Sequence, residues 1–159
     1  MIKSNKLCGL AALMLVVSMN WSLAAPHSAP AKTGIHKVEH VPQFSKTKHF
    51  SVASSIPKSA VSSKELVQAR KLIGKRGSFY GVVASIYVPK NGDGNYYIDF
   101  SKQWKSQLSA AVSAQHAANF PNLKQLEHHK VIVTGTFSLY GGDHPEILVT
   151  DPNQIHLLK

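Results

Sequence analysis

Aromatic residues and lysines lie close together at several points of the sequence, and this mixture could bind a nucleic acid chain. Aromatic rings stack on bases, each stack contributing roughly 1–3 kcal/mol, while lysines follow the phosphates. The same mixture also suits sugar rings. The candidate ligand-binding residues, for nucleic acid or a glycan, are Tyr87, Lys90, Tyr97, Lys102, Trp104, Lys105, Tyr140 and His144.

The alternative is that these residues have a structural role and bind no ligand. Tyr96, Phe100 and Trp104 could instead brace a core, and the lysines could simply be solvated. Arg70 and Arg76 are the only arginines in the sequence. Because arginine is the usual bidentate reader of bases, we expect any nucleic acid contact to be sensitive to salt and weakly selective.

The sequence offers little for catalysis or metal binding. Asp143, His144 and Glu146 are close together, but they fall in a predicted turn, and no nucleophile elbow or phosphate-binding loop is present. The nine histidines include His27, third after a predicted cleavage site, yet Pro26 has no amide proton for a square-planar metal chelate. We therefore expect no enzymatic activity, no metal site and no cofactor.

Composition points to one ordinary domain with an anionic partner. The chain has 159 residues, of which 43% are hydrophobic, so it can bury a core. Its 18 lysines and arginines outnumber 8 acidic residues, which gives a formal net charge of +10. Such an excess suits nucleic acid, a membrane surface or an acidic glycan. A single cysteine excludes an intrachain disulfide.

Residues 1–24 are typical of a secretory signal peptide. Lys3 and Lys6 precede an apolar run over 7–17, and Ser22-Leu23-Ala24 supplies small residues before the predicted cleavage. The apolar run is too short for the roughly 20 residues of a membrane-spanning helix, so we expect no stable membrane anchor after cleavage. The sequence therefore predicts an exported protein, periplasmic or extracellular.

A flexible basic arm is expected over residues 25–61. It is rich in proline, serine, alanine, lysine and histidine, without sustained periodicity. Phe44, Phe50 and Val52 are the residues of this arm that could dock on a neighbouring domain.

The remaining residues, 62–159, predict a small β-barrel. A capping box at Ser62–Glu65 begins a helix of about three turns that stops near Gly74. Alternating patterns then predict strands over 75–88, 95–100, 108–113, 130–140 and 146–150, with a helix over 114–120. This order predicts a mainly β protein, a five-stranded Greek-key OB-fold barrel with one helix between strands 3 and 4. An SH3-like barrel is the main alternative, but it does not usually place a helix there.

The stretch from Leu72 to Ile155 resembles the small OB-fold, nucleic-acid-binding-type domains of exported bacterial proteins, which also occur beside nuclease domains. The resemblance rests on the segments 73–75, 97–100, 119–123, 131–135, 139–142, 145–148 and 151–155. It covers about half of the chain and implies the fold more strongly than the ligand. No nuclease-like segment accompanies it.

We therefore expect an exported, non-enzymatic OB-fold protein that binds single-stranded nucleic acid or another anionic polymer through its barrel face and basic arm. The alternative is a periplasmic or secreted interaction module that recognises a protein, a glycan or a small ligand.

Overall fold

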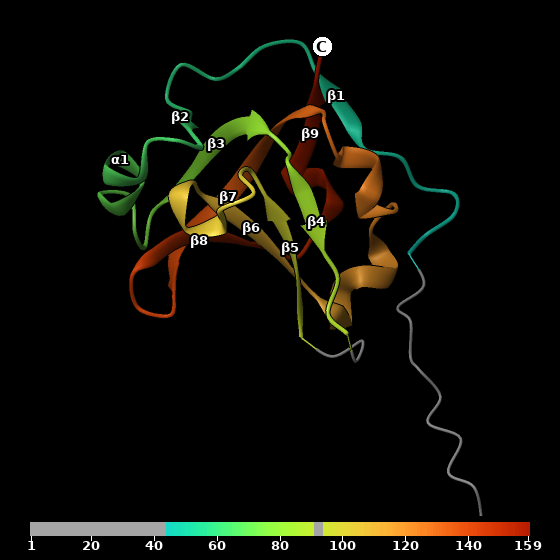
Figure 1. Cartoon of the computed structure of the whole chain (residues 1–159). Coiled ribbons are helices and arrows are strands. Elements are labelled where there is room, and N and C mark those ends of the chain that lie inside the picture. Colours follow the sequence, from blue (N-terminus) through green and yellow to red (C-terminus); the bar gives the residue numbers. More distant parts are fainter. Residues whose placement is uncertain (1–43, 91–93) are drawn as a thin grey trace, which may run out of the picture. The chain divides into compact units, whose positions relative to one another are not determined.

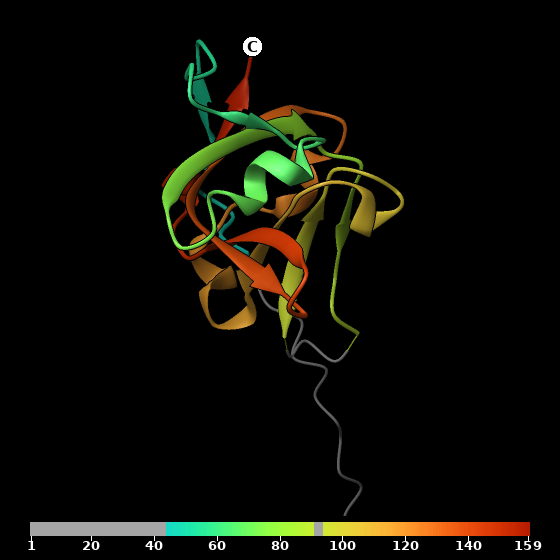
Figure 2. The ribbon, with the colours of Figure 1, turned by 90° about the vertical axis from the view of Figure 1, so that its left-hand side faces the viewer.

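The structure, a computed structural model, describes residues 44–90 and 94–159. The predicted signal peptide, residues 25–43 of the predicted arm and residues 91–93 between two predicted strands lie outside these ranges. The described part is mainly β, with a strongly curled sheet (Figures 1 and 2). No helix within it is long and apolar enough to cross a membrane.

The elements alternate short strands with single helical turns. In chain order they are β1 (Ser51–Ala53), β2 (Val61–Ser62), α1 (Leu66–Arg70), β3 (Arg76–Val82), β4 (Ser85–Tyr87), β5 (Asn95–Asp99), the 3₁₀ helix η1 (Trp104–Ser106), β6 (Ser109–Ser113), the 3₁₀ helices η2 (Ala114–Asn119) and η3 (Leu123–Leu126), β7 (Lys130–Tyr140), β8 (His144–Val149), the 3₁₀ helix η4 (Pro152–Gln154) and β9 (Ile155–Leu158).

A ring of strands closes because one bent segment takes part in both sides of the sheet. β3 pairs antiparallel with β7, and β4, which follows after Val83 and Ala84, pairs antiparallel with β5. The ring continues through the antiparallel pair β5–β6, the parallel pair β6–β8 and the antiparallel pair β7–β8. This closed strand order is compatible with the predicted OB-fold.

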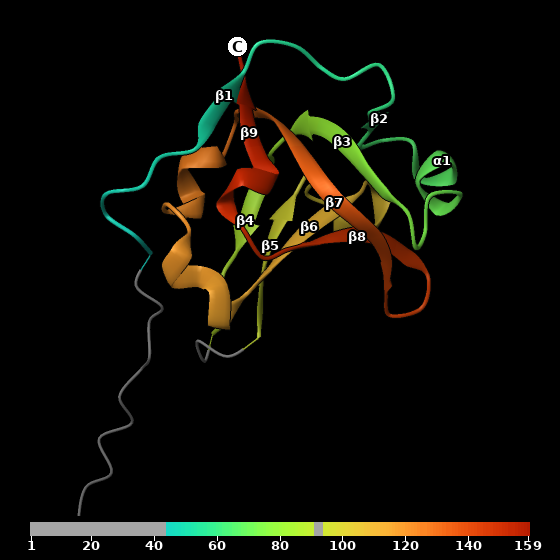
Figure 3. The ribbon, with the colours of Figure 1, turned by 180° about the vertical axis from the view of Figure 1, so that it is seen from behind.

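The sheet contains more strands than the five that the sequence predicts. Nine strands are present in the described residues, since the first predicted strand is divided into β3 and β4, and β1, β2 and β9 are additional. β9 follows η4, whose cap Asp151 and Gln154 form a reciprocal capping box around Pro152. The prediction ended the sheet at that proline, but the capped turn redirects the chain, and β9 pairs antiparallel with β7 (Figure 3).

Residues 44–61, expected within the flexible arm, lie on the barrel in the structure. β1 pairs parallel with β9, and the Ser51 hydroxyl lies 2.6 Å from Nδ1 of His156. Phe50 is buried, and the ring of Phe44 packs edge-on against Tyr96 with centroids 5.2 Å apart. Two of the three expected docking residues therefore contact the domain, whereas Val52 is 52% exposed.

The first helix is shorter than the predicted three turns. The Glu65 carboxylate accepts a hydrogen bond from the Ser62 amide at 3.0 Å, which is half of the expected capping box. Ser62 itself belongs to β2 and pairs with Tyr80, so it cannot begin the helix. As a result α1 spans Leu66–Arg70.

The helix predicted between the third and fourth strands is replaced by two 3₁₀ helices, η2 and η3. Pro121 favours extended backbone in the preceding residue, and Phe120 ends η2 in that conformation (φ −95°, ψ 149°). Asn122 then accepts a hydrogen bond from the Lys124 amide and caps η3. Pro121 therefore ends the helical segment close to the predicted end at residue 120, and η3 is an additional helical turn that the sequence analysis does not predict.

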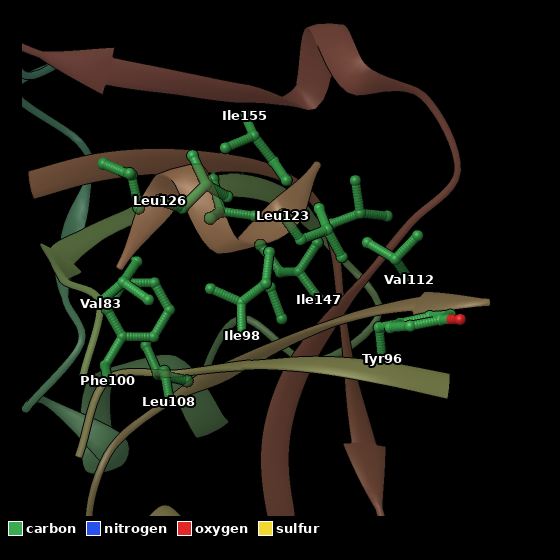
Figure 4. Packing of buried hydrophobic residues seen from close by; sticks show 14 of the residues in the cluster. Val83, Tyr96, Ile98, Phe100, Leu108, Val112, Leu123, Leu126, Ile147 and Ile155 are labelled. Atoms are coloured by element: carbon green, nitrogen blue, oxygen red, sulfur yellow. The ribbon is translucent and has the colours of Figure 1, made fainter. Parts of the chain in front are cut away.

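The core lies inside the ring and determines which side chains point outward (Figure 4). On β5, Tyr96 and Ile98 are buried within it, whereas Tyr97 and Asp99 point to the opposite face. Gly81 of β3 lies against this core, since a Cβ placed there would come within 2.6 Å of Cδ1 of Phe100. The alternation on β5 follows the prediction and positions the outer face described next.

Candidate ligand-binding face

The register of the sheet brings the outward-facing residues of five strands onto one surface. Tyr97 of β5 lies opposite Tyr87 of β4 and Ala111 of β6. Across the parallel β6–β8 pair, Ser109 lies opposite Glu146. Across the β7–β8 hairpin, Tyr140 lies opposite His144. Because side chains two residues apart share a face, these pairs define a single outer surface.

Aromatic rings from five elements form a continuous row on this surface. The ring centroids of Tyr87 and Tyr97 are 6.1 Å apart, and those of Tyr97 and Tyr140 are 5.5 Å apart. Trp104 of η1 continues the row, 5.9 Å from Tyr140 and 5.1 Å from His144. We call these five residues the aromatic row. The pairs are edge-on or tilted, a favourable geometry for aromatic contacts.

A pocket of about 210 Å³ opens between these rings. Its lining residues are Tyr87, Tyr97, Asp99, Trp104, Ser109 and Tyr140. Tyr87, Trp104 and Tyr140 are each between 41% and 50% exposed, so they offer free ring faces to a ligand. Drug-sized ligands usually occupy about 300–1,000 Å³. A pocket of this size therefore suits one flat ring or a similarly small group.

The predicted lysines are divided between this site and other places. The Nζ of Lys105 lies 5.2 Å from the centre of the Trp104 ring, at the edge of the aromatic row. Lys102 lines a second hollow together with Tyr80 and Lys130. Lys90 is exposed at the end of the segment after β4 and does not line the pocket. The structure thus brings together six of the eight predicted residues and leaves Lys90 and Lys102 outside.

His144 is a buried neighbour of the pocket rather than an exposed cation. Its Nε2 lies 3.1 Å from the Ser109 hydroxyl, and both side chains are buried. Burial lowers the pKa of His144, Asp143 acts in the opposite direction, and Lys105 and Arg70 lower it further. The imidazole is therefore mainly neutral at pH 7. It braces Trp104 and Ser109 and contributes no charge for phosphate binding.

Two carboxylates on this face were not among the predicted site residues. Asp99 lies between Ser85 and Ser109 in the sheet. Burial raises the pKa of Asp99. The alternation could have identified both groups, since Asp99 lies two residues after Tyr97, and Glu146 lies two residues after His144.

Glu146 is the more deeply buried of the two carboxylates. It is 7% exposed, and its Oε2 has no hydrogen-bond partner among residues 44–90 and 94–159. Burial raises the pKa of Glu146. Burial also raises the pKa of Tyr97 to about 12, an effect to which Tyr140 and Glu146 contribute. The pocket therefore combines neutral tyrosine hydroxyls with the carboxyl group of Asp99, and the buried Glu146 lies beside its lining residue Ser109.

The described side chains provide few groups for catalysis or metal binding. Ser109 and His144 are spaced like a hydroxyl and its base, but Nδ1 of His144 has no carboxylate partner in the part of the chain described. No group of three or more histidine, cysteine, aspartate or glutamate residues in that part could hold a metal ion. What the face does offer is stacking surface, hydrogen-bond acceptors and a few cations.

Comparison with protein-family models and with curated proteins finds no match. Two similar solved structures are chains assigned as aspartyl-tRNA synthetases. The one from Leishmania major Friedlin is 14% identical, with a TM-score of 0.45, over 69% of this chain and 23% of that chain. The one from Entamoeba histolytica is 16% identical, with a TM-score of 0.46, over 73% of this chain and 26% of that chain. The chain thus spans about a quarter of the length of each of these structures.

Proposed function

We propose that this chain is an exported, non-enzymatic OB-fold protein whose outer face binds single-stranded nucleic acid. The observation that carries the proposal is the aromatic row, which runs without a break across β4, β5, η1 and the β7–β8 hairpin. OB-folds bind extended chains on the face of their second and third strands and in the adjoining loops. β5 and β6 are the corresponding strands here.

Ring exposure and spacing support a stacking function. Structural aromatic residues are normally covered, but Tyr87, Trp104 and Tyr140 each expose more than 40% of their surface. Three such residues in one connected row form an apolar surface with polar edges, which is typical of a binding site. Bases of any sequence can stack on it, because every base has a π-face.

Positive charge around the row would hold the phosphates. Lys105 lies beside Trp104, and Arg70 reaches the same hairpin by donating a hydrogen bond from Nη2 to the Asp143 carbonyl at 2.9 Å. Removal of residues 1–24, which contain Lys3 and Lys6 and no acidic residue, lowers the formal charge from +10 to +8, and this excess still favours approach of a polyanion. The basic residues of the predicted arm are proposed to contribute in the same way.

Titration of the full chain with fluorescently labelled single-stranded oligothymidylate tests this function. We expect binding at about 50 mM salt that weakens by about tenfold or more at about 200 mM salt, because phosphate contacts release counterions. A matched duplex of the same length should bind more weakly, since its bases are not free to stack. Absence of binding at the lower salt, or binding that salt does not change, would overturn the proposal.

Export is tested separately by expressing the full chain with a carboxyl-terminal tag in a Gram-negative bacterium. We expect the tagged protein in the periplasm or the medium, with an amino terminus at Ala25 after removal of residues 1–24. An uncleaved protein retained in the cytoplasm would contradict export. Replacing Ala24 with Phe provides the control, because a bulky residue before the cleavage point should block processing.

A second function, recognition of a glycan, is favoured by one observation. Asp99, Ser109 and the tyrosine hydroxyls place acceptors and donors among aromatic rings, an arrangement that sugar hydroxyls could also use. Neutral oligosaccharides in the same titration distinguish the two functions. Binding of a neutral sugar without binding of oligothymidylate would replace the first proposal with the second.

A further inference from the structure

Charge in the candidate site changes with depth. The walls of the pocket are the rings of Tyr87, Tyr97, Trp104 and Tyr140, and its polar lining is supplied by Asp99 and Ser109. Cations lie outside these walls, where Lys105 flanks Trp104. A ligand that fills the site should therefore carry hydrogen-bond donors at its inner end, a flat ring in the middle and negative charge at its outer end. A nucleotide has this order of groups.

No cation is found among the described residues that line the pocket. Burial raises the pKa of Asp99, and no cation or hydrogen-bond donor among the described residues acts in the opposite direction. The Ser109 hydroxyl is already engaged with Nε2 of His144. Glu146, the partner of Ser109 in register, lies beside the lining residues and not among them, as a buried carboxylate with an unpartnered Oε2. Buried acceptors without donors are costly, so a ligand that supplies donors here is favoured.

The four bases differ in the donors that their Watson–Crick edges present. Guanine presents two adjacent donors, N1–H and the 2-amino group, which match the two oxygens of a carboxylate. Adenine and cytosine present one amino group next to a ring-nitrogen acceptor, which would face a carboxylate oxygen. Thymine and uracil present one N–H between two carbonyl acceptors. Guanine is therefore the base that an acidic pocket accepts with least repulsion.

We propose that the pocket selects guanine in single-stranded nucleic acid, with the base stacked among Tyr87, Tyr97 and Tyr140 and its N1–H and 2-amino group donating to the Asp99 carboxylate. This inference rests on the proposed nucleic acid function and adds base selectivity to it. The phosphates on either side of the guanine then lie near Lys105 and Arg70, outside the pocket.

Three single-stranded pentanucleotides measure this selectivity with the full chain. Their central residue is guanine, hypoxanthine (inosine) or thymine, and the four flanking residues are thymine. Inosine is the matched probe because it differs from guanosine only by lacking the 2-amino group. We expect the guanine pentamer to bind about tenfold more tightly than the inosine pentamer, within the range of a good carboxylate or amide contact to a base.

The variant Asp99→Asn assigns the preference to this pocket. An amide of the same shape presents one acceptor and one donor, so we expect the guanine-to-inosine ratio to fall to less than about twofold. Asp143→Asn is the control, because it removes a carboxylate from the neighbouring hairpin loop, outside the pocket lining. It should leave the ratio unchanged. Circular dichroism of each variant checks that the barrel is folded. The comparison of the three pentamers uses the unmodified chain, so it tests guanine selectivity even if a variant does not fold.

The outcomes separate this inference from the function on which it rests. Equal affinity for the three pentamers overturns guanine selection and leaves nucleic acid binding in place. No affinity for any of them, or for oligothymidylate at low salt, overturns the proposed function itself. A guanine preference that survives Asp99→Asn overturns the assignment to this pocket.

Discussion

Nε2 of His144 and the hydroxyl oxygen of Ser109 lie 3.1 Å apart, and the two side chains are 4% and 2% exposed. This contact joins β8 to β6 beneath the ring of Trp104, whose centroid is 5.1 Å from that of the imidazole. The polar pair therefore supports one wall of the candidate pocket from below.

Protonation of His144 should destabilise the folded protein. Burial lowers the pKa of this imidazole below its usual 6.5, so the unfolded chain binds the proton more readily than the folded one. The His144 contribution to stability is therefore full above about pH 6.5 and is lost as the pH falls toward the lowered pKa. We expect His144→Gln to lose less unfolding free energy than the unmodified chain between about pH 7.5 and about pH 5.5. Urea unfolding at both pH values measures this, and equal losses would contradict the prediction.

Glu146→Gln should stabilise the protein at neutral pH. Burial raises the pKa of Glu146, so the folded state holds this proton more tightly than the unfolded state, and ionisation opposes folding above the usual pKa. Removing the charge should raise the unfolding free energy at pH 7 by on the order of 1 kcal/mol, as expected for an uncompensated buried group. The gain should vanish below about pH 4, where both states are protonated. A variant that is less stable at pH 7 would show that the carboxylate has a partner after all.

Loss of a ring from the aromatic row should weaken nucleic acid binding. We expect Tyr140→Ala to reduce affinity for oligothymidylate by about fivefold to about 150-fold, the equivalent of one stacked base. Tyr80→Ala is the matched control, because Tyr80 lies in the second hollow with Lys102. Titrations of both variants under the same salt conditions distinguish the two surfaces. A larger loss of affinity in Tyr80→Ala than in Tyr140→Ala would show that the nucleic acid binds in the second hollow.

A methyl group at Gly81 should destabilise the barrel more than one at Gly77. A Cβ at Gly81 would overlap the Ser63 side chain and come within 2.6 Å of Phe100, whereas a Cβ at Gly77 would lie 3.0 Å from the Phe137 ring. We expect Gly81→Ala to cost about 1–3 kcal/mol or more, as in other overpacked cores. Thermal unfolding of the two alanine variants gives the ranking, and the reverse order would be inconsistent with this packing.

The segment before the barrel should contribute to stability through Phe50. Phe50 is buried, whereas Val52 in the same segment is 52% exposed. Phe50→Ala should therefore cost about 3–5 kcal/mol if the cavity does not collapse, while Val52→Ala should change stability by less than about 0.5 kcal/mol. Denaturant unfolding of both variants tests whether residues 44–61 belong to the folded domain. If both substitutions change the unfolding free energy equally little, residues 44–61 form a flexible arm and not a part of the folded domain.

Local alternation predicted much of the site, and long-range pairing explains what was missed. Tyr87, Tyr97 and Tyr140 come together as their strands were expected to place them. Local alternation places Asp99 on the face of Tyr97 and Glu146 on the face of His144, but the approach of Glu146 to Ser109 depends on the register between the parallel strands β6 and β8, which no local pattern specifies. Lys102 lies elsewhere because the chain turns between β5 and η1, so neighbours in sequence diverge in space.

The additional strands were missed for a related reason. β1 and β9 are three and four residues long, and each is a strand mainly because the other, or β7, lies beside it. The Ser62–Tyr80 pairing shortened the first helix in a way that local sequence does not show. Local sequence patterns thus predicted a mainly β fold, but they did not predict the additional short strands of the sheet.

The β1–β9 pair also restricts when the protein can finish folding. Ser51 and His156 are separated by 105 residues, so β1 has no partner until the ribosome has made the chain through Leu158. At about 5–20 residues per second, that interval lasts several seconds or more. During it, the strand β1 stays unpaired and accessible to chaperones and proteases. If the chain is exported, this strand would still be unpaired when it is threaded through a translocation channel.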